Sequence, residues 1–393
     1  MTTAILITEA FPLGGLTEEA FVAPEIAALA SEFDRVIVIP LVDRGVPKSG
    51  MPANVEVARD VIDATEWRHK WLRPLYHPLS AVSPYLLAAA TVEGALKRVI
   101  RHYGLTPAST VVESFWLDYP TIALANLRRK HGFRFVARAH RYDILIDKAP
   151  RRRGMAIAAS DGVYAVSEAG AEALRERFPG VASRISTAFL GVPAALRMAA
   201  HSPEGSCSLR ILTVAQATVR KRPGLCFDMA EALAVARPDW RVEWTLIGDG
   251  PELEPLQQRA AAGTRSNLTV NLLGAMPHHA VMDYYTTHEI DWFMLLSTSE
   301  GLPVSILEAL SYGVPVIATD AGGVSEAVDD ETGLLLPVDV EKEELVRGLV
   351  PYIDSRYRYN ALCEGAAMVV RERFDASRLR ADFAKKMKTI IEE

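Results

Sequence analysis

Cysteine is scarce in this chain of 393 residues. The three that occur, Cys207, Cys226 and Cys363, are widely spaced and form neither close pairs nor a metal-type pattern. This spacing argues against a disulfide-stapled secreted domain and against a cysteine zinc site. We therefore expect the protein to work in a reducing compartment.

The start of the chain lacks the features of a leader or a membrane anchor. "MTTAILITEAF" has no basic segment, and its apolar run is too short for a signal peptide or a membrane span. We expect a cytoplasmic protein on this basis.

Several signatures of cofactor and metal enzymes are also absent. Neither half of the chain opens with G-x-G-x-x-G, which disfavours a nicotinamide-dependent dehydrogenase. No D-x-D run follows an expected strand, and no histidines and cysteines have metal spacing. We therefore expect neither a cofactor nor a metal.

Charge is unevenly distributed along the sequence. The net charge is −6, yet residues 67–153 contain sixteen lysines and arginines against five acidic residues. Such a local excess suggests an anionic partner for the first half, either a membrane surface or a phosphate-bearing substrate. Because no recognisable nucleic-acid module accompanies it, we do not expect nucleic acid binding.

Short apolar runs alternate with amphipathic segments, the pattern of parallel sheets covered by helices. "AILIT", "RVIVIP" and "TVVES" are typical of the strands, and "YPTIALANLRRKHG" is typical of the helices. Because 199–208 is polar, small and turn-rich, we predict a linker there. The sequence thus predicts an α/β protein with two tandem doubly wound, Rossmann-like domains and a ligand cleft between them. The expected parts are an N-terminal domain 1–198, the linker 199–208, a second domain 209–373 and a closing helix within 374–393 that packs on the first domain.

The stretch "SEGLPVSILEALSYGVPVIATDAGG", residues 299–323, carries the most chemistry. Pro303 suits a first helical turn and Gly313 a helix end, so we expect a short helix over 303–312. Its free amides, near Val304 and Ser305, could bind phosphate, and Glu308 could accept hydrogen bonds from a ribose. The alternative is that Glu300 caps the helix and Glu308 is solvated.

The same stretch resembles the donor-site signature of retaining glycosyltransferases of family 4, in the GT-B superfamily. The resemblance extends to "LIGDGPELEPL", which is similar to a glycine-turn element, and to "LTVNLLGAMPHHAV", which is similar to the strand and loop beside the nucleotide base. It implies a GT-B fold and a nucleoside-diphosphate sugar donor of the UDP or GDP type. The implied donor-site residues in these segments are Gly248, Gly274, Ala275, Met276, Glu300, Gly301, Leu302, Pro303, Val304, Ser305 and Glu308.

The first half is similar to the same family at two places. "EAFPLGGLTEEAFVAPEIAALA" is similar to its glycine loop and helix, which assigns Gly14 and Gly15 to the donor phosphate or the acceptor; a tight turn is the alternative. "ARAHRYDIL" is similar to its H-x-x-D element, which makes His140 the residue that faces the donor sugar. Asp143 is expected to orient the loop.

One departure from the family pattern concerns the diphosphate. These enzymes usually present G-R-x-x-x-x-K after the first strand of the second domain, and this chain has "VAQATVRKRPG". Lys221 matches the lysine, but Gln216 stands in place of the arginine. Either Arg220 or Arg222 could contact the phosphates instead; the alternative is a solvated basic cluster.

The resemblance implies a metal-independent transferase that retains the anomeric configuration, with His140, Lys221 and Glu300 in the catalytic centre. The acceptor would be a glycan or a lipid-linked sugar, as in bacterial surface polysaccharide synthesis. Aromatic and basic residues alternate at Trp67, Arg68, Lys70, Trp71 and Arg73, and together with "PRRRG" (150–154) they suggest peripheral contact with anionic lipid on the inner face of the plasma membrane. A partly buried loop is the alternative. Two other functions stay open: a nucleotide-sugar hydrolase or epimerase of the same fold, and a non-catalytic nucleotide-sugar binding protein.

Overall fold

The computed structural model describes residues 1–13, 16–42, 45, 50–58, 84–145 and 150–392. It divides into two compact units: the first is Met1–Leu190 with Ser377–Glu393, and the second is Gly191–Ala376. Each is a parallel sheet covered by helices, which confirms the predicted fold class of two Rossmann-like domains.

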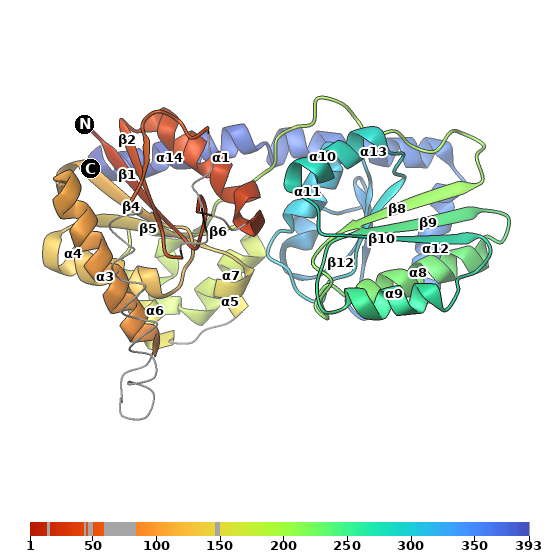
Figure 1. The fold of residues 1–393 in the computed structure, drawn as a ribbon, viewed down its shortest axis with the longest axis horizontal. Helices are drawn as coiled ribbons and strands as arrows, with labels where there is room; N and C mark the ends of the chain where they lie inside the picture. The colour runs from red at the N-terminus through yellow and green to blue at the C-terminus, as the bar shows by residue number, and fades with distance from the viewer. Residues whose placement is uncertain (14–15, 43–44, 46–49, 59–83, 146–149, 393) are drawn as a thin grey trace. The chain divides into compact units, whose positions relative to one another are not determined.

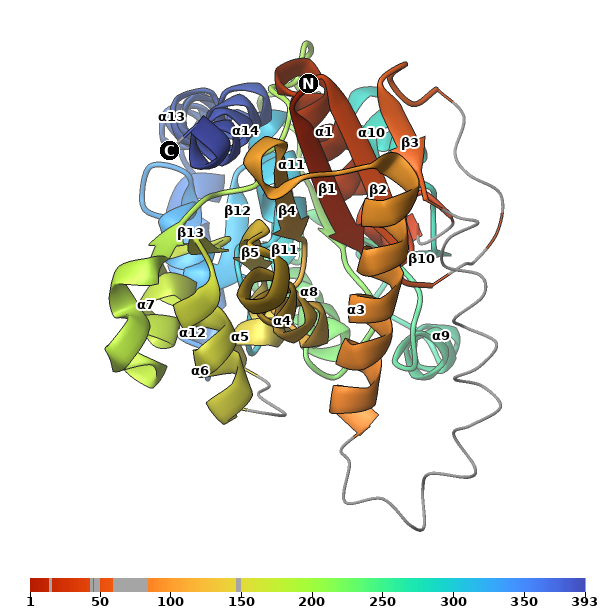
Figure 2. The same cartoon turned by 90° about the vertical axis from the view of Figure 1, so that its left-hand side faces the viewer.

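The first unit contains a seven-stranded sheet in the order β3-β2-β1-β4-β5-β6-β7, with all neighbours parallel. Figure 2 shows the same cartoon turned by 90° about the vertical axis. The strands are β1 (Thr3–Thr8), β2 (Arg35–Pro40), β3 (Val55–Val57), β4 (Thr110–Ser114), β5 (Arg134–Ala139), β6 (Gly162–Ala165) and β7 (Ile185–Thr187). The helices are α1 (Leu16–Glu32), α3 (Pro84–Tyr103), α4 (Tyr119–His131), α5 (Arg141–Leu145), α6 (Pro150–Ala159), α7 (Glu168–Arg177) and α14 (Ala376–Glu392), with short 3₁₀ turns η1 (Pro107–Ser109) and η2 (Pro179–Arg184).

Both faces of this sheet are buried, which explains the continuous apolar runs of its strands. In β1, Ala4 and Leu6 pack in the core under α1 and α14, whereas Ile5 and Ile7 pack on the opposite face under α3 and α4. Alternate side chains of this strand therefore pack into two different hydrophobic cores, one on each face of the sheet.

The closing helix α14 belongs to the first unit although it follows the second in sequence. Its Phe383, Ala384 and Met387 lie in the same hydrophobic core as Val22 and Ile26 of α1. The helix α14 begins at Ala376. It is separate from α13, which ends at Arg373, because Phe374 between them has non-helical backbone angles.

A buried ion network joins α14 to the sheet. Arg138 of β5 donates to Glu25 of α1 at 2.8 Å and to Glu113 of β4 at 3.3 Å, and Arg380 of α14 donates to Glu25 at 3.1 Å. The four side chains are at most 3% exposed. Burial and the nearby Glu25 raise the pKa of Glu113 above its usual range.

The second unit contains a six-stranded parallel sheet in the order β10-β9-β8-β11-β12-β13. The strands are β8 (Ser208–Val214), β9 (Arg241–Ile247), β10 (Leu268–Gly274), β11 (Trp292–Leu295), β12 (Val316–Thr319) and β13 (Gly333–Leu336). The helices are α8 (Pro223–Ala236), α9 (Leu253–Ala261), α10 (His278–Thr287), α11 (Val304–Ser311), α12 (Lys342–Ile353) and α13 (Arg356–Arg373), with the 3₁₀ turn η3 (Gly322–Glu326).

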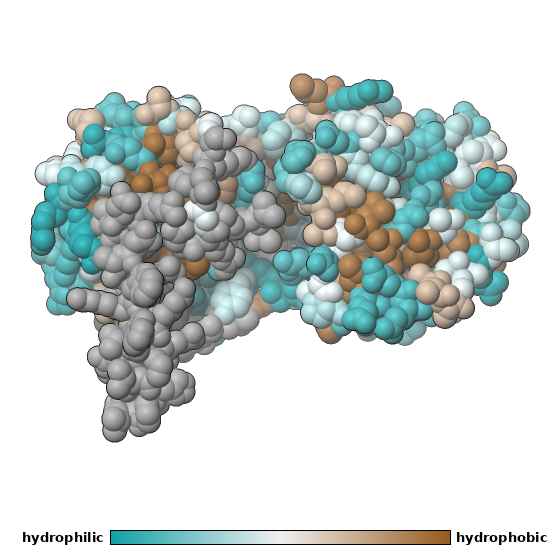
Figure 3. Space-filling view, viewed as in Figure 1, coloured by the Kyte–Doolittle hydropathy of each residue, from teal (hydrophilic) through white to brown (hydrophobic). Residues whose placement is uncertain are grey.

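This sheet leaves apolar surface exposed at one edge. Figure 3 shows brown surface on the second unit over the area where Figure 1 draws the edge strand β10. Leu273 of this strand is 41% exposed. The strand thus lacks the second layer of side chains that buries the central strands.

The segment predicted as a linker, 199–208, is instead part of the second unit. Ala200 pairs with Glu289, and the buried Ser202 bonds to Asp291 through both its amide and its hydroxyl, each at 2.7 Å. Small polar residues predict a linker when no partner is near in sequence. Here the Asp291 carboxylate, which accepts the hydrogen bonds of Ser202, is distant in sequence. The division between the units by contacts lies at Leu190 and Gly191, eight residues before the predicted boundary.

Candidate functional site

The strand order of the second unit reverses between β8 and β11, and residues from both carboxyl ends meet there. Lys221, in the loop after β8, places its amine 2.5 Å from a carboxylate oxygen of Glu300, which follows β11. Arg220 places a guanidinium nitrogen 2.9 Å from the same oxygen. Ligands of open parallel sheets bind at such reversal points. Two cations on one carboxylate leave this cluster with one net positive charge, which favours an anionic ligand.

Arg222 has a different role from its two neighbours. Its guanidinium donates to the carbonyl oxygens of Leu296 at 2.5 Å, Val338 at 2.7 Å and Ser297 at 3.4 Å. Through these bonds, Arg222 links the loop after β8 to the segments that follow β11 and β13. Of the two arginines that the sequence offered for the phosphates, the structure thus leaves Arg220 beside Lys221 and commits Arg222 to backbone.

The backbone of Glu300 is held by the glycines that close the quoted stretch. Gly322 has a φ of +69°, and a Cβ there would lie 2.1 Å from the carbonyl oxygen of Glu300. The amide of Gly323 donates to the carbonyl oxygen of Gly301 at 2.8 Å. Only glycine allows so close an approach at positive φ, so this pair positions the loop that carries the carboxylate.

The helix that follows Glu300 is α11, one residue shorter at each end than predicted. Pro303 is its N-cap and supplies no side-chain cap, and Gly301 and Leu302 before it are buried. The amides of Val304 and Ser305 open the helix, where no intrahelical acceptor exists for them. The Glu300 carboxylate contacts Arg220 and Lys221 and does not cap this helix. The two amides form the positive end of the helix dipole.

Glu308 lies in α11 with 8% of its surface exposed, so it is not a solvated side chain. Its carboxylate accepts a hydrogen bond from Nε2 of His278, 2.7 Å away at the start of α10. The resemblance assigns no role to His278, although this residue lies in the quoted segment "LTVNLLGAMPHHAV". The sequence feature that could have pointed to His278 is a histidine pair just after a proline. Its contact with Glu308, however, depends on the packing of α10 beside α11.

The other predicted donor residues lie at the carboxyl ends of β8, β9 and β10. Gln216 is exposed in the loop after β8. Gly248 follows β9 with a φ of +153°, and a Cβ there would overlap the carbonyl oxygen of Ala215 at 1.8 Å. Gly274 ends β10 with a φ of +71°, and the exposed Ala275 and half-buried Met276 lead from it to α10. These positions share one edge of the sheet with Lys221; their contact with a donor stays a prediction.

In the first unit, His140 follows β5 and opens α5. Its ring lies 4.8 Å from that of Phe115 and 4.4 Å from that of Trp116, measured between centroids. Asp143 accepts from the His140 amide at 2.9 Å and so orients the loop, as expected. Among the described residues, neither ring nitrogen has a hydrogen-bond partner. The ring thus packs against two aromatic rings in a tilted arrangement, and its two nitrogens are buried.

Two groups of predicted residues lie outside the described part of the chain. They are Gly14 and Gly15, and the proposed membrane face of Trp67, Arg68, Lys70, Trp71 and Arg73. Within the "PRRRG" segment, Arg151 and Arg152 are exposed, but Arg153 is 2% exposed and donates to the carbonyl of Asp143 at 2.5 Å. Arg153 therefore cannot take the lipid-facing role predicted for this segment.

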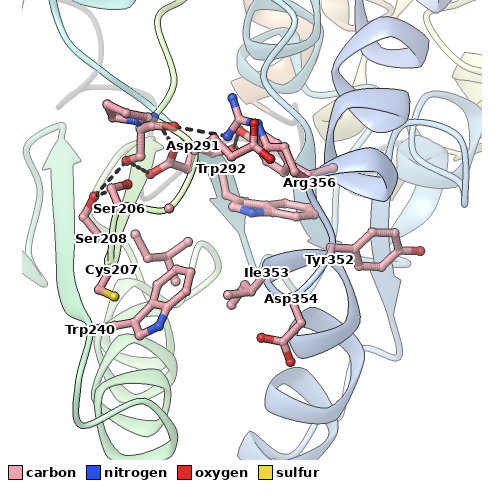
Figure 4. Close-up of a pocket in the computed structure, with 16 residues that line it drawn as sticks. Ser206, Cys207, Ser208, Trp240, Asp291, Trp292, Tyr352, Ile353, Asp354 and Arg356 are labelled. Atoms are coloured by element: carbon pink, nitrogen blue, oxygen red, sulfur yellow. Dashed lines mark hydrogen bonds between the residues drawn. The ribbon is translucent and has the colours of Figure 1, made fainter.

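A separate cavity of about 440 Å³ lies at the opposite, amino-terminal end of the second unit's strands (Figure 4). Ser206, Cys207 and Trp240 line one side of it, and Ile353 and Arg356 line the other. It contains none of the predicted site residues. The reversal point at the carboxyl edge is therefore the stronger candidate for the active site.

Within the described ranges, no group of three or more histidine, cysteine, aspartate or glutamate side chains could hold a metal ion. Over the same ranges, none of the helices has the length and apolar character needed to cross a membrane.

The comparison of the whole structure with solved structures concerns the fold. The apo form of the lipopolysaccharide outer core galactosyltransferase WaaB matches with a TM-score of 0.70 at 17% identity, over 98% of this chain and 100% of that one. Anabaena Alr3699/HepE in complex with UDP matches with a TM-score of 0.69 at 18% identity, over 99% and 100%. These matches confirm the fold, two Rossmann-like domains of the GT-B type.

The sequence comparisons concern the second unit. The chain is 32% identical over 148 residues to the lipopolysaccharide core biosynthesis mannosyltransferase LpsB of Rhizobium meliloti (strain 1021), which covers 36% of this chain and 40% of that protein. It is 30% identical over 152 residues to the putative teichuronic acid biosynthesis glycosyltransferase TuaC of Bacillus subtilis (strain 168), over 39% and 36%. The chain thus spans less than half the length of these relatives. A family model described as "Glycosyl transferases group 1" matches 208–354, the segment that carries Lys221, His278, Glu300 and Glu308.

Proposed function

We propose that the chain is a retaining glycosyltransferase that moves a sugar from a nucleoside-diphosphate sugar to a glycan or lipid-linked acceptor. The observation that carries this proposal is the pairing of Glu300 with Lys221 and Arg220 at the reversal point of the second sheet. The names of the relatives, which concern lipopolysaccharide and teichuronic acid, favour a role in bacterial surface polysaccharide synthesis.

Such a site would act on the leaving group. When the bond between the anomeric carbon and the phosphate oxygen breaks, negative charge grows on the diphosphate and positive charge on the sugar. Lys221, Arg220 and the first amides of α11 would stabilise the diphosphate, which lowers the barrier without requiring a metal. The acceptor oxygen would then attack from the face that the leaving group occupies, and its proton would pass to the departing phosphate. A second carboxylate of the hydrolase type is unnecessary in this scheme.

The nucleoside would extend along α11 from this point. Glu308 lies in the second turn, and its carboxylate already accepts from His278. A carboxylate has about four acceptor positions, so it can bind a ribose diol while keeping that bond. His278 would thereby fix the orientation of the carboxylate before the nucleotide arrives.

A paired substitution tests this assignment. In a screen of UDP, GDP, ADP and CMP, one nucleoside diphosphate should stabilise the wild-type protein against thermal unfolding. At a ligand concentration of a hundred times the Kd, the free energy of unfolding should rise by about 2.7 kcal/mol. Glu308→Ala should lose most of this stabilisation. His140→Ala should retain it but lower kcat about a hundredfold, because in this proposal its ring contacts the reacting sugar and not the nucleotide.

Matched variants control for general damage. Glu364 on α13 and His131 at the end of α4 are exposed, so Glu364→Ala and His131→Ala should behave as wild type. If Glu308→Ala and His140→Ala have the same kinetics as the unaltered protein, the site is wrongly assigned. If no nucleotide stabilises the wild-type protein, the transferase proposal fails. The replacement of the family's arginine by Gln216 would then explain the lack of nucleotide binding.

We also propose peripheral contact with anionic lipid through the first unit. The support is the exposure of Arg151 and Arg152 on α6, together with Met155, 72% exposed, and Leu145, 53% exposed. Each basic residue near an anionic surface contributes about 1 kcal/mol. Removing both should therefore lower partitioning into phosphatidylglycerol vesicles by at least about tenfold.

Co-sedimentation with vesicles measures this partitioning. The variant Arg151→Ala/Arg152→Ala should lose binding, Arg129→Ala on α4 should not, and added salt should weaken the wild-type interaction. Equal binding to neutral phosphatidylcholine vesicles would rule out an electrostatic contact.

A further inference from the structure

One buried carboxyl group of the first unit has no role in the proposed chemistry. Glu113 lies in β4, in the middle of the sheet, with β1 on one side and β5 on the other. Its side chain is on the same face of the strand as Val111 and Phe115, which belong to the hydrophobic core that α1 and α14 cover. Glu113 is therefore enclosed between the sheet and the closing helix, and its side chain is fully buried.

The two glutamates of the buried ion network are bonded unequally. Glu25 uses both carboxylate oxygens: Oε1 accepts from Arg138 at 2.8 Å, and Oε2 accepts from Arg380 at 3.1 Å. Glu113 has one long hydrogen bond, from Nε of Arg138 to its Oε1 at 3.3 Å. Among the described residues, its Oε2 has no hydrogen-bond partner. Both oxygens of Glu25 are thus paired with arginines, whereas Glu113 lacks the donors that a buried anion needs.

The two glutamates also share the guanidinium of Arg138, which donates in addition to the backbone carbonyl of Ala188 at 3.0 Å. An unpaired oxygen costs more on a buried anion than on a neutral carboxyl group, so a proton on Glu113 removes the larger penalty. Burial and the charge of Glu25 raise the pKa of Glu113 from 4.5 to about 8, although Arg138 opposes them. Glu113 therefore exchanges its proton close to neutral pH.

The other ionisable groups around Glu113 keep their charge in that range. On α14, burial lowers the pKa of Arg380 to about 10, so this side chain stays positive near neutral pH. Burial raises the pKa of Tyr164 on β6, and Lys386 of α14 lies 4.5 Å from the centroid of that ring. The strand β1 presents the apolar Leu6 in register with Glu113. Within this network, the charge of Glu113 is thus the one that changes between pH 6 and pH 8.5.

The helix α14 closes the space over Glu113. Its Arg380 donates to Glu25 and to the backbone carbonyl of Phe21, the latter at 2.6 Å, and the ring centroid of its Phe383 lies 3.8 Å from the Arg138 guanidinium. When α14 leaves the sheet, water reaches the carboxyl group and its pKa returns to the ordinary value. The docked form therefore binds the proton more tightly than the undocked form, and by linkage the proton favours docking.

We infer that Glu113 is a proton-binding site that couples the docking of α14 to pH, with the helix held most tightly when this carboxyl group carries a proton. The stabilisation is fully present below the ordinary pKa of 4.5, falls as the pH rises, and is lost above the docked-form pKa of about 8. This inference does not depend on the proposed transferase activity.

Hydrogen–deuterium exchange of the full chain, followed by mass spectrometry, measures the docking. The exchange rates of α14 peptides are divided by the intrinsic chemical rates at each pH, which gives the opening constant of the helix. We expect this constant to rise at least about tenfold between pH 6 and pH 8.5. Peptides from α13, in the second unit, are the internal reference and should have the same opening constant at both pH values.

A neutral variant of similar shape connects the pH dependence to this residue. Glu113→Gln should keep α14 as protected at pH 8.5 as at pH 6, because the amide does not titrate. Glu172→Gln, at an exposed position on α7, is the matched control and should keep the wild-type pH dependence. A purely structural role of Glu113 would change the protection at every pH alike and would leave the pH dependence in place.

Infrared spectroscopy of the wild-type protein decides the matter even where Glu113→Gln fails to fold. A band from a protonated carboxyl group should be present at pH 6 and lost by pH 9. Each of three results overturns the inference: the opening constant of α14 stays the same or falls as the pH rises, folded Glu113→Gln keeps the wild-type pH dependence, or the wild-type protein has no such band at pH 6.

Discussion

Lys221→Ala should lower kcat/KM for sugar transfer by about 30- to 150-fold, which corresponds to about 2–3 kcal/mol of transition-state stabilisation. The amine lies 2.5 Å from Glu300 at the reversal point of the second sheet, where the diphosphate would develop its charge. Removing it leaves Arg220 as the remaining cation on that carboxylate, so the cluster becomes neutral. The loss should fall mainly on kcat, because the charge on the leaving group is largest in the transition state.

Steady-state kinetics with the nucleotide sugar identified by the screen would measure this effect. Lys342→Ala on α12 is the control, since its amine is half exposed and lies 3.9 Å from Asp228. Lys221→Arg should recover part of the activity because it restores the charge. A wild-type rate in Lys221→Ala would contradict the phosphate role, and so would a loss of rate explained by lowered thermal stability.

Arg138→Ala should destabilise the first unit by about 3–5 kcal/mol, a large share of the stability of an ordinary domain. The guanidinium is fully buried between Glu25 and Glu113 and lies 3.8 Å from the ring centroid of Phe383 on α14. Its removal would leave two buried carboxylates with only Arg380 to offset them. The helix α14 would also lose the contact between the Arg138 guanidinium and the Phe383 ring.

Urea unfolding followed by circular dichroism would measure the free-energy change. Limited proteolysis would show whether α14 becomes accessible. Arg129→Ala, at an exposed position on α4, should unfold as wild type. A loss below about 1 kcal/mol in Arg138→Ala would mean that the network relaxes or admits water, and the stabilising role would be wrong.

The central strands of both sheets were predictable because they are buried on both faces. The run "RVIVIP" coincides with β2, and "TVVES" coincides with β4. The edge strands β3 and β7 were missed, since three residues each carry no usable pattern. The helix α3 was not predicted either, because the proline- and aromatic-rich segment before it was interpreted as a membrane contact.

By itself, the sequence determined the fold class and singled out the stretch 299–323, because burial patterns and glycine requirements are local in the chain. Only the tertiary structure decided which side chains meet. It showed that Arg220 contacts Glu300 whereas Arg222 bonds to backbone carbonyls. It also showed that Glu308 accepts from His278 and that the 199–208 segment belongs to the second unit. It also brought Asp118 and Asp143, from two different strand ends, to one cavity. The physical reason is that parallel sheets align the ends of strands that are far apart in sequence, and no periodicity records those encounters.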